Sequence, residues 1–267
     1  FMVNVNKKNV QGKAKVKPSL TGFLGLISFS TRIPIKRYVT IEQMSGSVIL
    51  WPYIGLGIGI IGAVMAYILS NIFGFSSFLT ATMLYCFLIW FTGFNHVDGI
   101  LDMGDGLMAH GEPEKRLSIM RDSMVGAGGI ATFFIIAIMT IAALSSVPAQ
   151  YLIASIILME LCAKLSMITS MVFGRTDSNG IGKEIKKGMD YKILIFTIII
   201  SLIIGYFLLN ASGVMAVFAS VISGLYLSNV ADKSFGCVTG DIFGASNEIA
   251  KVVSLLFIIL NLNIMLL

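Results

Sequence analysis

The chain has 267 residues, of which 56% are hydrophobic and only 12% are charged, and its mean hydropathy is +0.89. Soluble domains carry about 25% charged residues, so this composition excludes an ordinary soluble protein and indicates an integral membrane protein. The formal net charge is +5, but the basic residues lie beside apolar runs, which indicates membrane topology rather than nucleic-acid binding. The three cysteines are scattered and form no C-x-x-C, so we expect neither a disulfide framework nor a zinc site.

The first 19 residues are predicted to be a basic cytoplasmic tail. Residues 4–17 contain five lysines and no acid, and they lack the apolar core of a cleavable signal peptide. The remaining residues, 20–267, are expected to form a single membrane-embedded domain. Its first segment, 20–30, is apolar but too short to cross a bilayer, which favours an interfacial helix.

Seven longer apolar runs follow, each near the ~20 residues that a helix needs to cross a bilayer. The expected fold class is therefore all-α: a polytopic membrane bundle of about seven transmembrane helices with a short interfacial helix at its N-terminal end. The runs are 46–73, 76–97, 125–147, 149–173, 192–209, 212–231 and 249–267.

The connections between these runs are of two alternating kinds. Three are very short and uncharged, near 74–75, 148 and 210–211. Three are long and contain nearly all the remaining ionisable residues, at 98–124, 174–191 and 232–248. The positive-inside rule places the long set and the N-terminus in the cytoplasm of a plasma-membrane protein. A chain with its polar motifs on one face is typical of an enzyme that meets soluble substrates there.

Three of the fourteen acidic residues fall within eight positions, after the second apolar run. If this segment is helical, Asp98, Asp102 and Asp105 lie within roughly 60° of one another, because a helix turns ~100° per residue. Aligned carboxylates repel one another unless a cation lies between them, and a hard divalent ion such as Mg²⁺ suits them. The alternative is a solvated acidic face, but the flanks are apolar and rich in glycine. We therefore expect a magnesium site.

Arginines follow the aspartates. Arg116 and Arg121 lie in a segment where Pro113, with acids on both sides, favours the start of a helix. Arginine beside a metal site is suited to a phosphate or pyrophosphate substrate, and interfacial positive charge is the simpler alternative. Arg175 directly follows an apolar run, where membrane anchoring alone would explain it.

Polar residues also occur at two other places. Glu160 and Lys164 form an i, i+4 pair near the middle of an apolar run, where ionisable residues usually face the bundle interior. A structural ion pair and a functional one are both open. In the last long connection Asp241 and Glu248 are seven residues apart and share a helix face, with Asn247 beside them. This second acidic group could complete the site that the first begins.

Three segments together resemble the cobalamin-5′-phosphate synthase family, also called adenosylcobinamide-GDP ribazoletransferase. His96–Gly106 is similar to H-x-D-G-x-x-D-x-x-D-G, Arg116–Gly126 to R-L-x-I-M-[KR]-D-S-x-x-G, and Gly236–Glu248 to G-x-x-x-G-D-x-x-G-A-x-x-E. Arg32 looks like the arginine of an early R-[IV]-P, and Arg175 opens a segment like R-x-x-G-[LI]-G with one extra residue. The resemblance spans about residues 23 to 250.

Some positions depart from the family pattern. Met124 replaces a frequent Arg or His, and Phe94-Asn95 replaces a pair closer to glycine and leucine. Lys164 occurs where an arginine is expected, which removes bidentate contacts at that position. None of these departures touches the aspartates.

The resemblance implies a reaction between adenosylcobinamide-GDP and α-ribazole, or its 5′-phosphate, that releases GMP. A ribose hydroxyl attacks the cobinamide-bound phosphorus of a pyrophosphate. Such chemistry needs a divalent metal, carboxylates that bind it and arginines that bind phosphate. We expect the metal, Mg²⁺, to be bound by Asp98, Asp102 and Asp105, with Asp241 as a further ligand.

The resemblance also implies roles for the surrounding residues. Arg116, Arg121 and Arg175 would contact phosphates, and the wider set of substrate-binding residues adds Arg32, Lys164, Asn247 and Glu248. The base that accepts the hydroxyl proton could be Asp105, Asp122 or His96, and a loose transition state needs little basic help. His96 could equally be a structural hydrogen-bonding residue.

Two other functions compete with this interpretation. A CDP-alcohol phosphotransferase also uses spaced aspartates, but no Ala-Arg follows Gly99 as that pattern requires. An ion or proton transporter would place its site near the midplane, often within inverted repeats, and no repeat is evident. The expected partners are the two substrates and the lipid bilayer, without nucleic acid. The sequence leaves the oligomeric state open, and a homo-oligomer is compatible with it.

Overall fold

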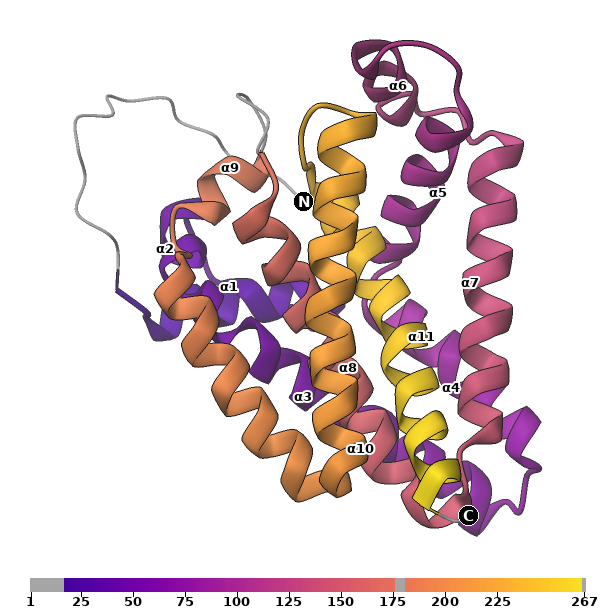
Figure 1. The fold of residues 1–267 in the computed structure, drawn as a ribbon. Coiled ribbons are helices and arrows are strands. Elements are labelled where there is room, and N and C mark those ends of the chain that lie inside the picture. The colour runs from indigo at the N-terminus through magenta and orange to yellow at the C-terminus, as the bar shows by residue number, and fades with distance from the viewer. Residues whose placement is uncertain (1–16, 176–180, 266–267) are drawn as a thin grey trace.

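The computed structural model describes residues 17–175 and 181–265 (Figure 1), so most of the predicted basic tail lies outside the described residues. Within these ranges every regular element is a helix, which confirms the predicted all-α fold. The first element, α1 (Leu20–Ser30), coincides with the short helix predicted at 20–30 and lies across the direction of the long helices (Figure 1). Its Ser30 hydroxyl accepts a 2.7 Å hydrogen bond from Trp51 Nε1 of the following long helix.

The remaining helices continue in chain order. The first group is α2 (Ile41–Gly46), the short 3₁₀ helix η1 (Val48–Leu50), α3 (Trp51–Tyr67), the π-helical turn η2 (Ile68–Ile72), α4 (Ser77–Phe91) and α5 (Asn95–Met108). The second group is α6 (Pro113–Met120), α7 (Ala127–Ser146), α8 (Ala149–Phe173), α9 (Ile181–Lys186), α10 (Tyr191–Ser234) and α11 (Gly240–Met265).

Within the described residues, five helical segments are long and apolar enough to cross a membrane, or six if α4 and α5 count as one bent span. Two of the predicted runs, 192–209 and 212–231, both lie in α10, which therefore counts once. The backbone of α10 leaves helical geometry at Leu209 and Asn210, where Asn210 has a φ of 49°. Figure 1 shows two arms of α10 meeting at this kink, where a tight turn was predicted. The polytopic architecture is confirmed, and the count of seven stays a prediction.

The prediction of a continuous span over 76–97 is wrong, because the chain turns by 93° between α4 and α5. Gly93 has a φ of 74°, its N–H donates to the carbonyl of Trp90, and the N–H of Phe94 donates to that of Ile89. This pair of hydrogen bonds around a left-handed glycine is the Schellman motif, which ends a helix. The residues on both sides of the bend are apolar, so the hydropathy stays high across it. The apolar run in the sequence therefore does not reveal the bend.

The predicted boundary before the last run is also wrong. α10 extends to Ser234 and α11 begins at Gly240, so the connection is only 235–239 rather than 232–248. Asn247 and Glu248 therefore lie inside a long helix, and both are fully buried. Their polarity suggested a loop, but partners on neighbouring helices replace the solvent that a loop would provide.

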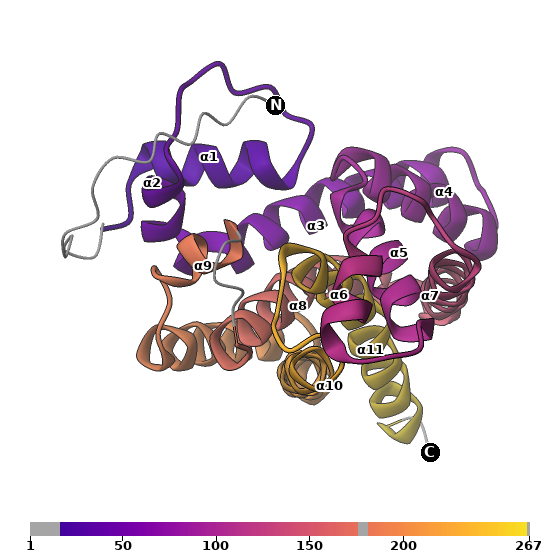
Figure 2. The same ribbon diagram turned by 90° about the horizontal axis from the view of Figure 1, so that it is seen from above.

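α8 lies at the centre of the bundle and packs against α3, α10 and α11. Every side chain from Leu158 to Val172 is buried, so this helix faces protein on all sides. Seen from above, α5, α6, α7 and α11 gather on one side of the molecule, and α1 and α2 lie on the other (Figure 2). α5, α6 and the first residues of α7 and α11 share one end of the bundle, and the short connections lie at the opposite end (Figure 1).

Candidate functional site

The three aspartates of the predicted stripe lie on one helix, as expected. Asp98, Asp102 and Asp105 all belong to α5, and Asp98 is exposed while the other two are half-buried. Asp98 and Asp105 both act electrostatically on Asp102, which places the three charges in one neighbourhood. The flanking positions His96, Ile100 and Met103 are buried, so the stripe lies at the edge of the packed core.

α11 brings a fourth carboxylate to the stripe. Asp241, in the first turn of α11, interacts electrostatically with both Asp98 and Asp102. Its Oδ2 also accepts a 3.2 Å hydrogen bond from the hydroxyl of Thr239. The structure thus unites residues about 140 positions apart in the chain. Asp241 of the second acidic group therefore lies near the first group, and its part in completing a metal site stays a prediction.

Gly99 permits this approach of α5 and α11. A Cβ atom at residue 99 would collide with the backbone carbonyl of Asp241 and would lie 3.1 Å from the backbone nitrogen of Ala245. Contacts below about 3.4 Å require the neighbour to move, and backbone atoms move with difficulty. The glycine directly after Asp98 therefore allows the two helices to touch where the two carboxylates meet.

Asp105 lies against the start of α7. Its Oδ2 accepts a 2.6 Å hydrogen bond from the N–H of Gly126, and its Oδ1 accepts a 2.8 Å hydrogen bond from the N–H of Gly129. These are backbone donors of a first helical turn, which have no partner within their own helix. Asp105 therefore caps α7 from a neighbouring helix, in addition to any role at a metal.

Of the predicted phosphate-binding arginines on α6, one interacts with the acidic cluster, which consists of Asp98, Asp102, Asp105 and Asp241. Arg121, at the end of α6, is exposed and acts electrostatically on Asp241. Arg116 instead donates to backbone carbonyls, 3.1 Å from Nε to Gly111 and 3.3 Å from Nη1 to Leu107. Leu107 lies in the last turn of α5, so Arg116 ties α6 to the end of the aspartate helix.

Arg175 is joined to the segment that leads into α11. Its N–H donates to Asp232 Oδ1 at 2.9 Å, and its carbonyl accepts from the N–H of Val238. The preceding carbonyl, of Gly174, accepts a 2.6 Å hydrogen bond from Lys186 Nζ of α9. Burial lowers the pKa of the Lys186 ammonium, and Asp232 acts in the opposite direction. The structure thus places Arg175 beside the loop that precedes Asp241.

Arg32 and Asp122 occupy other parts of the site. The N–H of Arg32 donates to the carbonyl of Phe91 at 2.8 Å, and its guanidinium lies 4.9 Å from the ring centroid of Trp90. Arg32 thus packs on the bend between α4 and α5. Asp122 is exposed and accepts a 3.1 Å hydrogen bond from the N–H of Met124. Their proposed roles in binding and proton transfer stay predictions.

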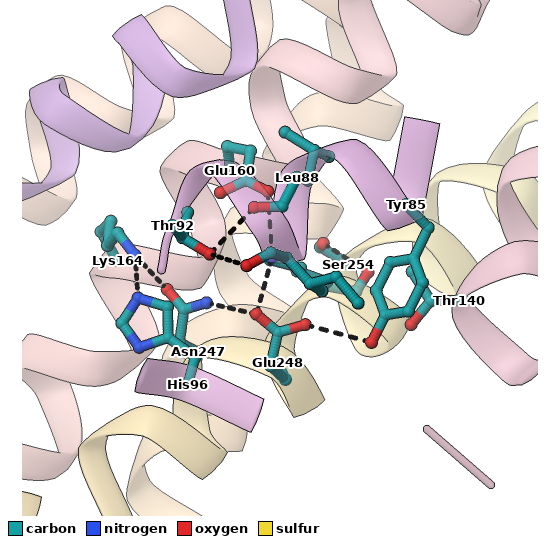
Figure 3. A network of polar contacts seen from close by, with 12 residues as sticks. Tyr85, Leu88, Thr92, His96, Thr140, Glu160, Lys164, Asn247, Glu248 and Ser254 are labelled. Carbon is teal, nitrogen blue, oxygen red and sulfur yellow. Dashed lines mark hydrogen bonds and ion pairs between the residues drawn. The ribbon is translucent and has the colours of Figure 1, made fainter. Parts of the chain in front are cut away.

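His96, Lys164 and Asn247 meet inside the bundle (Figure 3). Lys164 Nζ lies 2.7 Å from His96 Nε2 and 2.6 Å from Asn247 Oδ1. An ammonium can only donate, so Nε2 of the histidine accepts and its proton resides on Nδ1. His96 is 5% exposed and the other two side chains are fully buried. These three residues, predicted for catalysis or substrate binding, contact one another beneath the aspartates.

Glu160 pairs with a residue that the sequence did not indicate. Lys251 Nζ of α11 lies 3.1 Å from Glu160 Oε1 and 2.7 Å from Glu248 Oε1, and all three side chains have no exposed area. Glu248 Oε2 also accepts from the hydroxyl of Tyr85 at 3.5 Å. The expected i, i+4 partner of Glu160, Lys164, points instead to His96 (Figure 3). Lys251 falls three residues after Glu248 within an apolar run, which is the signal that could have identified it.

The acidic cluster suits a hard divalent cation by donor chemistry. Among the residues that the structure describes, no three His, Cys, Asp or Glu side chains converge into a preformed metal-binding group. Magnesium usually keeps several waters and binds through one or two carboxylates together with substrate phosphates, so a complete protein cage is not required. Asp98, Asp102 and Asp241 offer such carboxylates at one end of the bundle, with Arg121 nearby.

The fold and the site together define a polytopic membrane protein with carboxylates and arginines gathered at one end of a helical bundle. The model of one family, described as cobalamin-5-phosphate synthase, matches residues 22–259. The chain therefore belongs to the cobalamin-5-phosphate synthase family, as the three sequence patterns indicated.

Relatives named adenosylcobinamide-GDP ribazoletransferase match nearly the whole chain. The relative from Methanosarcina mazei is 27% identical over 264 residues, which cover 92% of this chain and 94% of the relative. Those from Picrophilus torridus and Acetivibrio thermocellus are 31% and 30% identical, and the matches cover 91% and 86% of this chain and 98% and 94% of the relatives. No solved structure matches the chain. Neither a CDP-alcohol phosphotransferase nor a transporter is favoured by these comparisons.

Proposed function

We propose that this chain is an adenosylcobinamide-GDP ribazoletransferase of the last steps of cobalamin biosynthesis. It joins adenosylcobinamide-GDP to α-ribazole, or to α-ribazole 5′-phosphate, and releases GMP. The observation that carries this proposal is the meeting of the α5 aspartates with Asp241 and Arg121, within a chain of the cobalamin-5-phosphate synthase family. Carboxylates opposed by an arginine suit a substrate with a pyrophosphate.

In the proposed reaction a ribose hydroxyl of the acceptor attacks the cobinamide-bound phosphorus, and the bond to the GMP oxygen breaks. Asp98, Asp102 and Asp241 would bind magnesium, which supplies neutralisation of the charge on the pyrophosphate oxygens. Arg121 would bind a phosphate of the substrate, because its guanidinium lies near the cluster and is exposed. Arg116 would orient α6, and with it Arg121, through its hydrogen bonds to the end of α5.

No side chain is proposed as a dominant general base. The lone pair of His96 Nε2 accepts from Lys164, and both carboxylate oxygens of Asp105 accept from the start of α7. Asp122 is exposed and already accepts from the N–H of Met124. A loose transition state for phosphoryl transfer places little demand on a base, so positioning and charge neutralisation would carry the catalysis.

We also propose that the protein lies in the plasma membrane with the acidic cluster and the N-terminus on the cytoplasmic side. The connections at the opposite end of the bundle, around residues 72–76, 147–148 and 209–212, contain no lysine or arginine. The positive-inside rule then supports this orientation. The substrates would reach the site from the cytoplasm.

The proposal is tested with purified protein in detergent micelles, given adenosylcobinamide-GDP and α-ribazole. With Mg²⁺ present, we expect GMP and the cobalamin product to appear in equal amounts by chromatography, and EDTA should abolish both. A reaction without the acceptor controls for hydrolysis, and a parallel reaction with α-ribazole 5′-phosphate compares the two acceptors. If no GMP forms with any divalent metal, the proposed function is wrong.

A further inference from the structure

Lys164 is the residue at which hydrogen bonds join α5, α8 and α11. Its ammonium donates to His96 Nε2 of α5 at 2.7 Å and to Asn247 Oδ1 of α11 at 2.6 Å (Figure 3). Its side chain is fully buried in α8, and its stem packs on the backbone of α3 at Gly55. The family resemblance predicted Lys164 as a substrate-binding residue, but these contacts give it another use.

The amide of Asn247 has one orientation available to it. Its Nδ2 donates to Glu248 Oε1 at 2.9 Å, which directs Oδ1 toward Lys164. Glu248 is in turn 2.7 Å from Lys251 Nζ, whose other acidic partner is Glu160. The positive formal charges of the two buried lysines thus cancel the negative formal charges of the two buried glutamates. Hydrogen bonds to His96 of α5 and to Asn247 of α11 therefore determine the position of the Lys164 ammonium.

His96 connects this network to the acidic cluster. It lies in the first turn of α5, two residues before Asp98 and just after the 93° bend at Gly93 and Phe94. The bend separates α5 from α4, and α5 packs against α11 and α7. Asn247 belongs to the same helix as Asp241, which acts electrostatically on Asp98. A contact that joins His96 to Asn247 therefore also relates Asp98 to Asp241.

We propose that Lys164 is a positioning residue that, through His96 and Asn247, sets the position of Asp98 relative to Asp241. This inference rests on the proposed binding of a divalent cation by these aspartates. Neither Lys164 nor His96 touches the substrate in this proposal. Residues that orient metal ligands from behind typically change metal affinity by about 10–100-fold when they are replaced.

The test measures Mn²⁺ binding, because free Mn²⁺ has a strong paramagnetic resonance signal that disappears on binding. The protein is the full chain in detergent, without substrates. Lys164→Met removes the donor, and His96→Leu removes the acceptor without changing the buried charge. We expect either change to raise the dissociation constant for Mn²⁺ about 10-fold or more. His96→Gln keeps an acceptor at similar reach and should restore the constant to within about threefold of wild type.

Ser166→Ala is the matched control, because Ser166 is also buried on α8 and lies 2.9 Å from Ser246 of α11. It removes a hydrogen bond between the same two helices without touching His96, so its Mn²⁺ affinity should equal that of wild type. Thermal unfolding is recorded for every variant, and if Lys164→Met does not fold, the His96 pair decides the result. If His96→Leu binds Mn²⁺ as tightly as wild type, the inference is wrong. It is also wrong if His96→Gln binds Mn²⁺ as weakly as His96→Leu. Neither result contradicts the proposed metal site. Absence of Mn²⁺ binding by wild type would mean that the aspartates bind no divalent cation without substrate phosphates, and it overturns the inference, while the detergent assay for GMP release tests the proposed function separately.

Discussion

At the scale of single residues, Asp98 is the exposed member of the acidic cluster, and it interacts electrostatically with Asp102 of α5 and with Asp241 of α11. We predict that Asp98→Asn lowers the rate of GMP release by about 100-fold or more, because a neutral amide binds Mg²⁺ and neutralises charge poorly. The rate is measured in the detergent assay at saturating substrates. Thermal unfolding should change little, because Asp98 is not buried. Glu114→Gln, which removes an exposed carboxylate of α6, should leave the rate unaltered.

For Asp105 we predict an effect on stability, because both of its carboxylate oxygens accept hydrogen bonds from backbone N–H groups of α7. Asp105→Ala should lower the free energy of unfolding by about 1–2 kcal/mol, as the loss of a helix cap usually does. Asp105→Asn retains one acceptor oxygen, so it should lower the free energy of unfolding by less than Asp105→Ala does. It still lacks the negative charge that favours a helix N-terminus. Reversible denaturation in mixed micelles measures both values. Equal stability of Asp105→Ala and wild type would show that the cap is unimportant.

The sequence predicted the carboxylates well and the buried cations less well. Asp98, Asp102 and Asp105 could be placed on one face because helical geometry relates them directly. Lys251 could not be paired with Glu160 from the sequence, because the two lie on different helices about 90 residues apart. Lys164 has a carboxylate one helical turn away at Glu160, yet it points to His96 and Asn247. Tertiary packing, which the local pattern does not contain, decided these partners.

At the scale of helices, the contact of α5 with α11 depends on Gly99. We predict that Gly99→Ala lowers the free energy of unfolding by about 1–3 kcal/mol and also reduces the rate of GMP release, because the added methyl group would push Asp241 away. Gly57→Ala is the matched control, since a Cβ atom there meets no atom within 4 Å. That change should be neutral or stabilise α3 by about 0.5–1 kcal/mol. Unfolding and activity are measured in the same detergent for both variants. Equal effects of the two changes would contradict the proposed helix contact.

The boundaries of helices show where hydropathy is informative and where it is not. The runs at 125–147 and 149–173 correspond closely to α7 and α8, because Pro148 separates the two helices and charged connections lie beyond their other ends. The run at 76–97 continues across a 93° turn, since apolar residues flank the Schellman motif at Gly93. α11 begins well before its apolar run, because Asn247 and Glu248 bind buried partners. Thus a polar stretch is not always a loop, and an apolar stretch is not always one helix.

At the scale of the whole molecule, the helices divide the polar residues into two sets. One set, with the aspartates and arginines, lies at the end formed by α5, α6 and the start of α11 (Figure 1). The other set, Glu160, Lys164, Glu248 and Lys251, is fully buried between helices. A transporter would need the buried set to be reached by its ions, but here it consists of side chains that are paired with one another. The exposed set is the one available to soluble substrates.

The proposed orientation of the bundle gives the last prediction. Lys115 is exposed on α6 at the end with the aspartates, and Asn71 is exposed near the short connection at the opposite end. A cysteine replaces each of them in turn, in a background in which Cys86, Cys162 and Cys237 are alanine and activity is retained. A maleimide that does not cross membranes should label Asn71→Cys in intact cells, because that end would face outward. Lys115→Cys should be labelled only after the membrane is permeabilised. Both sites should react fully in denatured protein, which controls for the chemistry of each thiol. The reverse labelling pattern would place the acidic cluster outside the cytoplasm, where a nucleotide-activated substrate would not be supplied. It would contradict the proposed orientation and the positive-inside argument on which that orientation rests.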